Sequence, residues 1–127
     1  MRVGSLFSGV GGFDRGLEDV GFEIAWQVER DPFARKILSK HWPHVTCGDD
    51  VREWPGDRRE PIDLLCGGFP CQDLSVAGKR AGLAGERSGL FWEIVRIAKT
   101  IKPTWGLFEN VPGLFSSGGG ARYGHGP

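Results

Sequence analysis

The sequence lacks the features of an exported, membrane-spanning or strongly basic protein. It contains three cysteines and no long apolar segment near its start, which favours reduced thiols and a cytoplasmic location. It has no run of about 18 apolar residues, so no membrane span is expected. Lysine plus arginine and aspartate plus glutamate both number 16, so the net charge of +0 provides no global field to attract nucleic acid. A local basic strip remains compatible with nucleic-acid binding.

Glycine is the residue type that the chain has in excess. The 21 glycines exceed the usual share of roughly 7%, and they cluster at 9–12, 67–68 and 118–120. A chain of 127 residues is expected to form one domain that buries roughly two thirds of its unfolded surface. Within that domain, the glycine clusters mark candidate turns and close approaches of the backbone.

Short apolar runs alternate with segments of helical periodicity along the chain. The pattern predicts strands over 2–7, 22–28, 44–47, 62–66 and 104–108. It predicts helices over 13–20, from Asp31-Pro32 onward and from a Ser88 cap onward. Residues 54–61 and 67–87 are expected to be loops. This alternation predicts an α/β fold with a doubly wound, mostly parallel sheet.

The segment Ser8-Gly9-Val10-Gly11-Gly12 joins the first predicted strand to the first predicted helix. Glycines in such a loop let the backbone turn sharply and approach a ligand closely, although similar loops also occur as plain turns. Glu29 follows about 20 residues later, at the end of the second strand, where a carboxylate receives ribose hydroxyls. Together these features predict a nucleoside cofactor.

The loop departs from the dinucleotide fingerprint G-x-G-x-x-G because Asp14 occupies the last position of that pattern. An acid beside the loop would also repel a pyrophosphate. Both points favour a cofactor without phosphates, such as S-adenosylmethionine. Asp49, after the third strand, is a candidate acceptor for an adenine amino group, and a turn-forming aspartate is the alternative.

Cys71 is the candidate nucleophile. It lies just beyond the predicted strand 62–66, on a turn shaped by glycine and proline, at the edge where open α/β sheets place their chemistry. Cys66, inside the strand, is expected to serve packing instead. Glu109 follows the fifth strand at the same edge, where a partly desolvated carboxylate could hold a proton near neutral pH. A solvated loop acid is the alternative for Glu109.

A set of motifs in this chain resembles the DNA cytosine-5 methyltransferases over residues 2 to about 117. The motifs are Phe7-Ser8-Gly9-Val10-Gly11-Gly12-Phe13, Glu29, Gly48-Asp49, Gly68-Phe69-Pro70-Cys71-Gln72 with Ser75, Arg87-Ser88-Gly89-Leu90, and Glu109-Asn110-Val111. The Pro-Cys-Gln and Glu-Asn-Val pair is far more specific than any single glycine loop. The resemblance implies a Rossmann-like S-adenosylmethionine-dependent methyltransferase fold, incomplete in this chain.

The resemblance also implies a reaction, the transfer of a methyl group from S-adenosylmethionine to carbon 5 of cytosine in DNA. The biological role that it implies is restriction-modification. The Cys71 thiolate would attack carbon 6, and Glu109 would engage the ring nitrogen and exocyclic amine. Pro70 and Asn110 would complete the catalytic residues. Because the thiol must reach the face of the ring, the cytosine would be flipped out of double-stranded DNA.

Two groups of binding residues follow from the same motifs. The cofactor-binding residues would be Phe7, Ser8, Gly9, Gly11, Gly12, Phe13, Glu29, Asp49, Pro70 and Leu90. The DNA-binding residues, on a loop expected to close over phosphates, would be Gln72, Ser75, Lys79, Arg80 and Arg87. A basic loop that is merely solvated is the alternative for the second group.

The resemblance divides the chain into a partial cofactor-binding and catalytic subdomain, 1–115, and an irregular glycine-rich tail, 116–127. In the family, an arginine-bearing motif, a target-recognition region and a final helix follow Glu-Asn-Val, and this sequence contains none of them. We therefore expect that the chain alone neither methylates DNA nor discriminates sequence, and that a carboxy-terminal polypeptide would complement it.

Three other interpretations compete. His41-x-x-His44-x-x-Cys47 has metal-ligand residue types, but a fourth ligand is not obvious, so no metal is expected. A cysteine hydrolase would pair Cys71 with a histidine base and leave Glu109 without a role. A non-catalytic cofactor- or DNA-binding remnant is the third. The five tryptophans are expected to pack in the core and at its rim.

Overall fold

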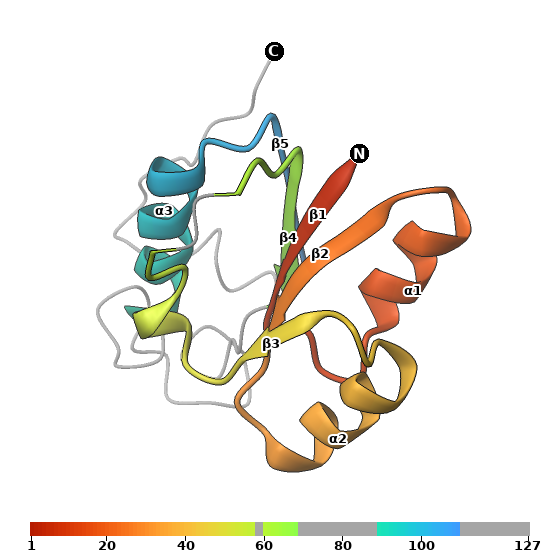
Figure 1. Ribbon diagram of the computed structural model, residues 1–127. Helices are drawn as coiled ribbons and strands as arrows, with labels where there is room; N and C mark the ends of the chain where they lie inside the picture. Colours follow the sequence, from red (N-terminus) through yellow and green to blue (C-terminus); the bar gives the residue numbers. More distant parts are fainter. Residues whose placement is uncertain (58–59, 69–88, 110–127) are drawn as a thin grey trace.

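A computed structural model describes residues 1–57, 60–68 and 89–109 of the chain. In these ranges a five-stranded sheet has the order β3-β2-β1-β4-β5, and every strand pairing is parallel. The helices α1 and α2 lie on one side of the sheet and α3 on the other (Figure 1). The predicted doubly wound parallel sheet is confirmed. The elements are β1 (Arg2–Leu6), α1 (Gly12–Asp19), β2 (Glu23–Val28), α2 (Pro32–His41), β3 (Thr46–Gly48), the 3-10 helix η1 (Val51–Glu53), β4 (Leu64–Gly68), α3 (Gly89–Ile101) and β5 (Trp105–Glu109).

The order of the strands creates a switch point beside β1. The chain runs outward from β1 through β2 to β3 and then returns to β4 on the other side of β1. Helices that follow strands on opposite sides of such a point diverge, so a crevice opens at the carboxyl ends of the strands. In this protein the crevice lies between the ends of β1 and β4.

Apolar side chains alternate between the two faces of the sheet, as the period of a strand requires. In β4, Leu65 packs with the α3 residues Ile94 and Ile97, whereas Leu64 and Cys66 pack on the face of α2. Trp26, Trp42 and Trp54 are buried, and Trp92 and Trp105 are exposed. This division confirms the expected packing role for the first three tryptophans and not for the exposed pair.

The first turn of α2 follows the predicted chemistry. Asp31 caps the helix by accepting a hydrogen bond from the Phe33 amide at 3.2 Å, and Pro32 occupies the first turn. The Ser88 cap predicted for α3 and the tail 116–127 lie outside the described residues.

The position of β4 corrects one prediction. The strand includes Gly67 and Gly68, which the sequence indicated as a turn, and it begins two residues later than predicted. Gly67 pairs with both Leu6 and Phe108. A Cβ atom at Gly67 would lie 2.3 Å from the Leu6 carbonyl oxygen, so only glycine lets the central strands approach this closely.

Among the described residues, no helix combines the length and apolarity needed to cross a bilayer.

Candidate functional site

The glycine loop turns sharply between β1 and α1. Phe7 has a φ of 50°, a conformation that costs a non-glycine residue of order 1–3 kcal/mol and that concentrates at functional sites. Gly11 has a φ of 92°, and a Cβ atom there would lie 2.4 Å from the Trp42 ring. Both the left-handed conformation and the closeness of the ring require glycine at this position.

Glu29, at the end of β2, holds the glycine loop through its carboxylate. Oε1 accepts a hydrogen bond from the Gly9 amide at 2.7 Å, and Oε2 accepts one from the Asp31 amide at 2.8 Å. The Gly11 amide donates to the Ser8 carbonyl oxygen at 3.0 Å. The Gly9 and Gly11 amides are therefore not offered to a phosphate. Each carboxylate oxygen has two acceptor sites, so Glu29 can still accept hydrogen bonds from a ligand.

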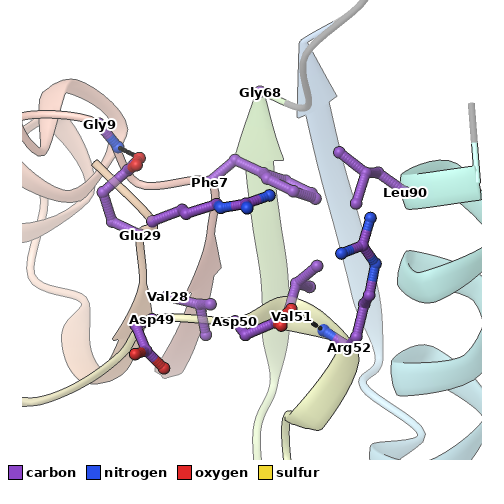
Figure 2. Close-up of a pocket in the computed structure, with 11 residues that line it drawn as sticks. Phe7, Gly9, Val28, Glu29, Asp49, Asp50, Val51, Arg52, Gly68 and Leu90 are labelled. Atoms are coloured by element: carbon purple, nitrogen blue, oxygen red, sulfur yellow. Dashed lines mark hydrogen bonds between the residues drawn. The ribbon is translucent and has the colours of Figure 1, made fainter. Parts of the chain in front are cut away.

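A cavity of about 620 Å³ opens at the carboxyl ends of the strands (Figure 2). The Phe7 and Leu90 side chains point toward each other across it. Its lining residues are Phe7, Gly9, Val28, Glu29, Arg30, Asp49, Asp50, Val51, Arg52, Gly68 and Leu90. The structure thus brings together five residues that the sequence predicted for the cofactor: Phe7, Gly9, Glu29, Asp49 and Leu90.

The remaining predicted loop residues lie elsewhere. Gly11 and Gly12 line a separate cavity of about 330 Å³ with Trp42. The Ser8 hydroxyl lies 2.9 Å from the Ser5 hydroxyl, and Phe13 is 36% exposed on α1. These four residues do not line the larger cavity, because the Ser8 side chain turns back to Ser5 in β1 and the backbone leads away from the cavity after Gly9.

The segment after β3 supplies cavity residues that the sequence analysis missed. Asp50 caps η1 by accepting a hydrogen bond from the Arg52 amide at 2.9 Å. Asp49 lies 3.7 Å from the Arg35 guanidinium, and its side chain is 74% exposed. The sequence did contain one signal for η1, because Asp50 is a residue type favoured at the N-cap of a helix. A helix of three residues is too short to show helical periodicity, so the pattern of apolar residues did not predict it.

Asp14 does not face a ligand beside the glycine loop, although the sequence suggested that it would. It is fully buried, and its carboxylate accepts hydrogen bonds from the Ser5 hydroxyl at 2.6 Å and the Gln27 amide at 2.7 Å. Burial raises the pKa of Asp14, and the two side-chain hydrogen bonds oppose that shift. The first turn of α1 faces the sheet, so this residue points toward β1 and β2 and links the helix to both strands.

The two cysteines in the described ranges are poor nucleophiles. Cys66 is fully buried in β4, as predicted, and burial raises its pKa to about 12. Burial also raises the pKa of Cys47, although Arg35 partly opposes that shift. Thiolates, not thiols, attack carbon centres, so neither side chain is activated at neutral pH.

Several predicted residues lie outside the described ranges. They are the catalytic residues Pro70, Cys71 and Asn110 and the DNA-binding residues Gln72, Ser75, Lys79, Arg80 and Arg87.

Glu109, by contrast, lies within the described ranges. It ends β5 opposite Gly68, and a Cβ atom at Gly68 would lie 3.2 Å from the Glu109 Oε2 atom. The Glu109 carboxylate therefore lies over Gly68, which also lines the cavity. Glu109 is exposed, so the described residues do not provide the partial desolvation that the sequence suggested.

The proposed metal motif is split between elements. His41 ends α2, whereas Cys47 lies in β3. Within 1–57, 60–68 and 89–109, no three histidine, cysteine or acidic side chains gather in a way that could hold a metal ion.

Comparison with known proteins places these features in a family. The family model for C-5 cytosine-specific DNA methylase matches residues 1–122. The type II methyltransferase M2.BsuMI of Bacillus subtilis is 43% identical over an alignment of 119 residues. The match covers 88% of this chain and 29% of that protein. The type II methyltransferase M.FnuDI of Fusobacterium nucleatum is 40% identical, over 91% of this chain and 34% of that protein.

The fold agrees with these relatives. The crystal structure of the S. pombe Dnmt2 methyltransferase superposes with a TM-score of 0.72 at 24% identity, over 92% of this chain and 38% of that one. The chain thus spans about a third of the length of the relatives that it matches. With the family model covering nearly the whole sequence, this chain belongs to the C-5 cytosine-specific DNA methylase family.

Proposed function

We propose that this chain is the cofactor-binding and catalytic part of an enzyme that transfers a methyl group from S-adenosylmethionine to carbon 5 of cytosine in DNA. One observation carries the proposal. The Glu109 carboxylate, at the end of β5, lies over Gly68, and Gly68 lines the cavity formed by Phe7, Glu29 and Leu90. A base held by Glu109 would therefore lie beside a cofactor in that cavity.

The cavity suits a nucleoside cofactor without phosphates. Its volume of about 620 Å³ falls in the range of small-molecule sites. The three carboxylates of Glu29, Asp49 and Asp50 outnumber the two lining guanidinium groups, of Arg30 and Arg52, so the lining is acidic on balance and disfavours a polyphosphate. The Gly9 amide that could bind a phosphate is already bonded to Glu29. S-adenosylmethionine supplies an electrophilic methyl group on a positive sulfonium, which tolerates this acidic lining.

The adenosine part of the cofactor has partners of suitable chemistry in this proposal. Glu29 retains acceptor capacity for ribose hydroxyls, and Asp49 or its neighbour Asp50 can accept from an adenine amino group. Phe7, Val28, Val51 and Leu90 supply apolar surface for the adenine ring.

Cys71 is the proposed nucleophile. It follows Gly68 by three residues, and three residues span at most about 11 Å, so the thiol is tethered to the edge that carries Glu109. The thiolate would add to carbon 6 of a flipped cytosine, which makes carbon 5 nucleophilic. Glu109 would hydrogen-bond the ring nitrogen and exocyclic amine. Carbon 5 would take the methyl group as the bond between that group and the cofactor sulfur breaks, which leaves a neutral thioether. A base would then remove the carbon-5 proton, and the bond between carbon 6 and the Cys71 sulfur would break to release the thiolate. The basic residues Lys79, Arg80 and Arg87 would contact DNA phosphates.

The proposal is tested with a hybrid enzyme in which this chain replaces the matching amino-terminal part of Bacillus subtilis M2.BsuMI. The hybrid is incubated with duplex DNA and cofactor carrying a labelled methyl group, and the DNA is digested to nucleosides. We expect the label in 5-methyldeoxycytidine with the hybrid and no label with the 127-residue chain alone. A folded hybrid that binds cofactor but transfers no label would instead support a non-catalytic remnant. Label in a different nucleoside would contradict the proposed Cys71 and Glu109 chemistry.

A further inference from the structure

The wall of the cavity that includes Asp50, Val51 and Arg52 is built on a weak local structure. The 3-10 helix η1 has only three residues, Val51–Glu53. Such helices have poor hydrogen-bond geometry, and their last carbonyl groups have no partner within the helix. The amides of Glu53 and Trp54 donate over 3.2 Å to the carbonyl oxygens of Asp50 and Val51. Local bonding alone therefore gives this wall little rigidity.

Arg96 on α3 supplies what η1 lacks. Its Nη2 atom donates to the carbonyl oxygens of Val51 at 2.9 Å, Trp54 at 2.5 Å and Arg52 at 3.2 Å. These contacts join residues 42 to 45 positions apart. Hydrogen bonds from a charged donor are roughly twice as strong as neutral ones. The two N–H groups of this nitrogen are shared among three carbonyl groups of residues 51–54, which joins this segment to a long helix.

The other side of the guanidinium is held as well. The Nε atom of Arg96 donates to the Glu93 carboxylate at 2.6 Å, one turn earlier on α3. Beneath these polar contacts, Val51 and Trp54 pack in the same apolar cluster as Ile94 and Ile97. The fork geometry of arginine allows both sets of contacts at once, whereas the single ammonium of lysine does not.

We infer that Arg96 is a positioning residue for the cofactor cavity. It touches no ligand itself, because it is not among the lining residues. It fixes residues 51–54, and through them the Asp50 cap and the Val51 surface. The inference rests on the proposed function, since it concerns the S-adenosylmethionine cavity. Arg96 accordingly holds one wall of the cavity against α3, and the affinity for the cofactor depends on that wall staying in place.

Nuclear magnetic resonance of the full 127-residue chain, labelled with nitrogen-15, tests this inference. Amide hydrogen exchange at Glu53 and Trp54 reports on η1, and the Trp42 amide, bonded to Leu38 in α2, is the reference. Titration with S-adenosylmethionine gives a dissociation constant even when binding is weak. The variants are Arg96→Met, which keeps the apolar stem, Arg96→Lys, which keeps a charged donor, and the control Glu93→Gln.

For Arg96→Met we expect exchange at Glu53 and Trp54 to rise roughly tenfold and cofactor affinity to fall about 5–20-fold, which is no more than the scale of one charge-assisted hydrogen bond because Arg96 acts on the ligand only through residues 51–54. Exchange at Trp42 should stay within about twofold. Arg96→Lys should fall between Arg96→Met and the wild-type chain. Glu93→Gln removes the ion pair but leaves the carbonyl contacts, so both quantities should change by less than about threefold.

Two results would overturn the inference. Faster exchange at Trp42 as well as at η1 would mean that Arg96 only stabilises the whole fold. Faster exchange at η1 with unchanged cofactor affinity would mean that the tether does not position the cavity. If the wild-type chain shows no cofactor-induced shifts, the proposed cofactor is wrong. In that case the exchange pattern alone decides whether Arg96 fixes residues 51–54.

Discussion

The two halves of the sheet differ in how well they are covered. Around β1 and β2 both faces are closed, with α1 and α2 on one side and α3 and η1 on the other (Figure 1). Trp26 of β2 is fully buried, whereas Trp105 of β5 is 62% exposed and Leu107 is 42% exposed. Only Phe108 of β5 packs against the core cluster below α3. Within the described ranges, the cofactor half is closed and the half that carries Glu109 is open on one face.

The difference separates the two parts of the proposed site. The glycine loop and Glu29 lie in the closed half, whereas Glu109 lies at the end of the exposed strand β5. Exposed apolar residues on an edge strand favour pairing or covering by further polypeptide. The chain spans about a third of the length of its relatives, and the complementing carboxy-terminal polypeptide stays a prediction. Phe13 of α1, at 36% exposed, is a second apolar residue that such a segment could cover.

The largest expected effect concerns Cys71, the proposed nucleophile. In the hybrid enzyme, Cys71→Ser should abolish methyl transfer, with a loss of at least about a thousandfold, because the hydroxyl is a far weaker nucleophile than a thiolate. It should also abolish covalent trapping on DNA that contains 5-fluorocytosine. Transfer of labelled methyl groups and gel mobility of the trapped complex measure both.

Two matched variants accompany this test. Cys47→Ala and Cys66→Ala should leave the chemistry intact, because burial raises the pKa of both thiols. Cys66→Ala should lower stability, since this side chain is fully buried in β4. Persistent trapping in Cys71→Ser would refute the assignment of the nucleophile.

A pair of tryptophan variants tests the difference in cover directly. Trp26→Ala should lower the free energy of unfolding by about 3–5 kcal/mol, the usual cost of deleting a fully buried aromatic side chain. Trp105→Ala should change it by about 0.5 kcal/mol or less, as at other exposed positions. Urea unfolding followed by circular dichroism provides both values. Similar losses at the two positions would show that the exposed face of β5 is covered in solution, for example by a second copy.

Replacement of Glu29 tests the closed half. Glu29→Ala should weaken S-adenosylmethionine binding by about 1.5–3 kcal/mol, the scale of charge-assisted hydrogen bonds. Part of the loss should come from the glycine loop, since Glu29 also holds the Gly9 amide. Titration calorimetry on the hybrid enzyme gives the affinity. Glu23→Ala is the matched control, because Glu23 begins the same strand and is exposed. Equal affinity in the two variants would reduce Glu29 to a surface acid.

The smallest effect is expected at Asp14, as a change in pH dependence. Burial raises its pKa in the folded state above the ordinary value of 3.8. The stability contributed by the protonated form is therefore present below pH 3.8 and is lost as pH rises through the folded pKa. Asp14→Asn carries no charge at any pH. The stability of the wild-type chain relative to this variant should therefore fall over that interval and then level off.

Urea unfolding at a series of pH values measures this difference. The asparagine amide can donate to the Ser5 hydroxyl, whose proton can then turn to Ser8, so the variant should remain folded. A difference that rises with pH would contradict the shift in the pKa of Asp14.

Local sequence patterns determined much of this protein. The alternation of apolar runs and helical segments predicted the parallel sheet, because periods of 2 and 3.6 residues are properties of short stretches. The Asp31-Pro32 helix start and the buried position of Cys66 were predicted for the same reason, since each depends on neighbours in the sequence. Both β3 and β4 begin two residues later than predicted, because strand ends are set by pairing partners elsewhere in the chain.

Only the tertiary structure decided which polar groups meet. The sequence suggested that Asp14 is an acid beside the glycine loop. The packing of α1 on the sheet instead buries its side chain between Ser5 and Gln27. Glu29 was correctly placed at the end of β2, whereas its bond to the Gly9 amide depends on two strands lying side by side. The contact of Arg96 with the carbonyl groups in and just after η1 joins residues 42 to 45 positions apart. Such partners are chosen by the strand order β3-β2-β1-β4-β5, which no local period of the sequence encodes.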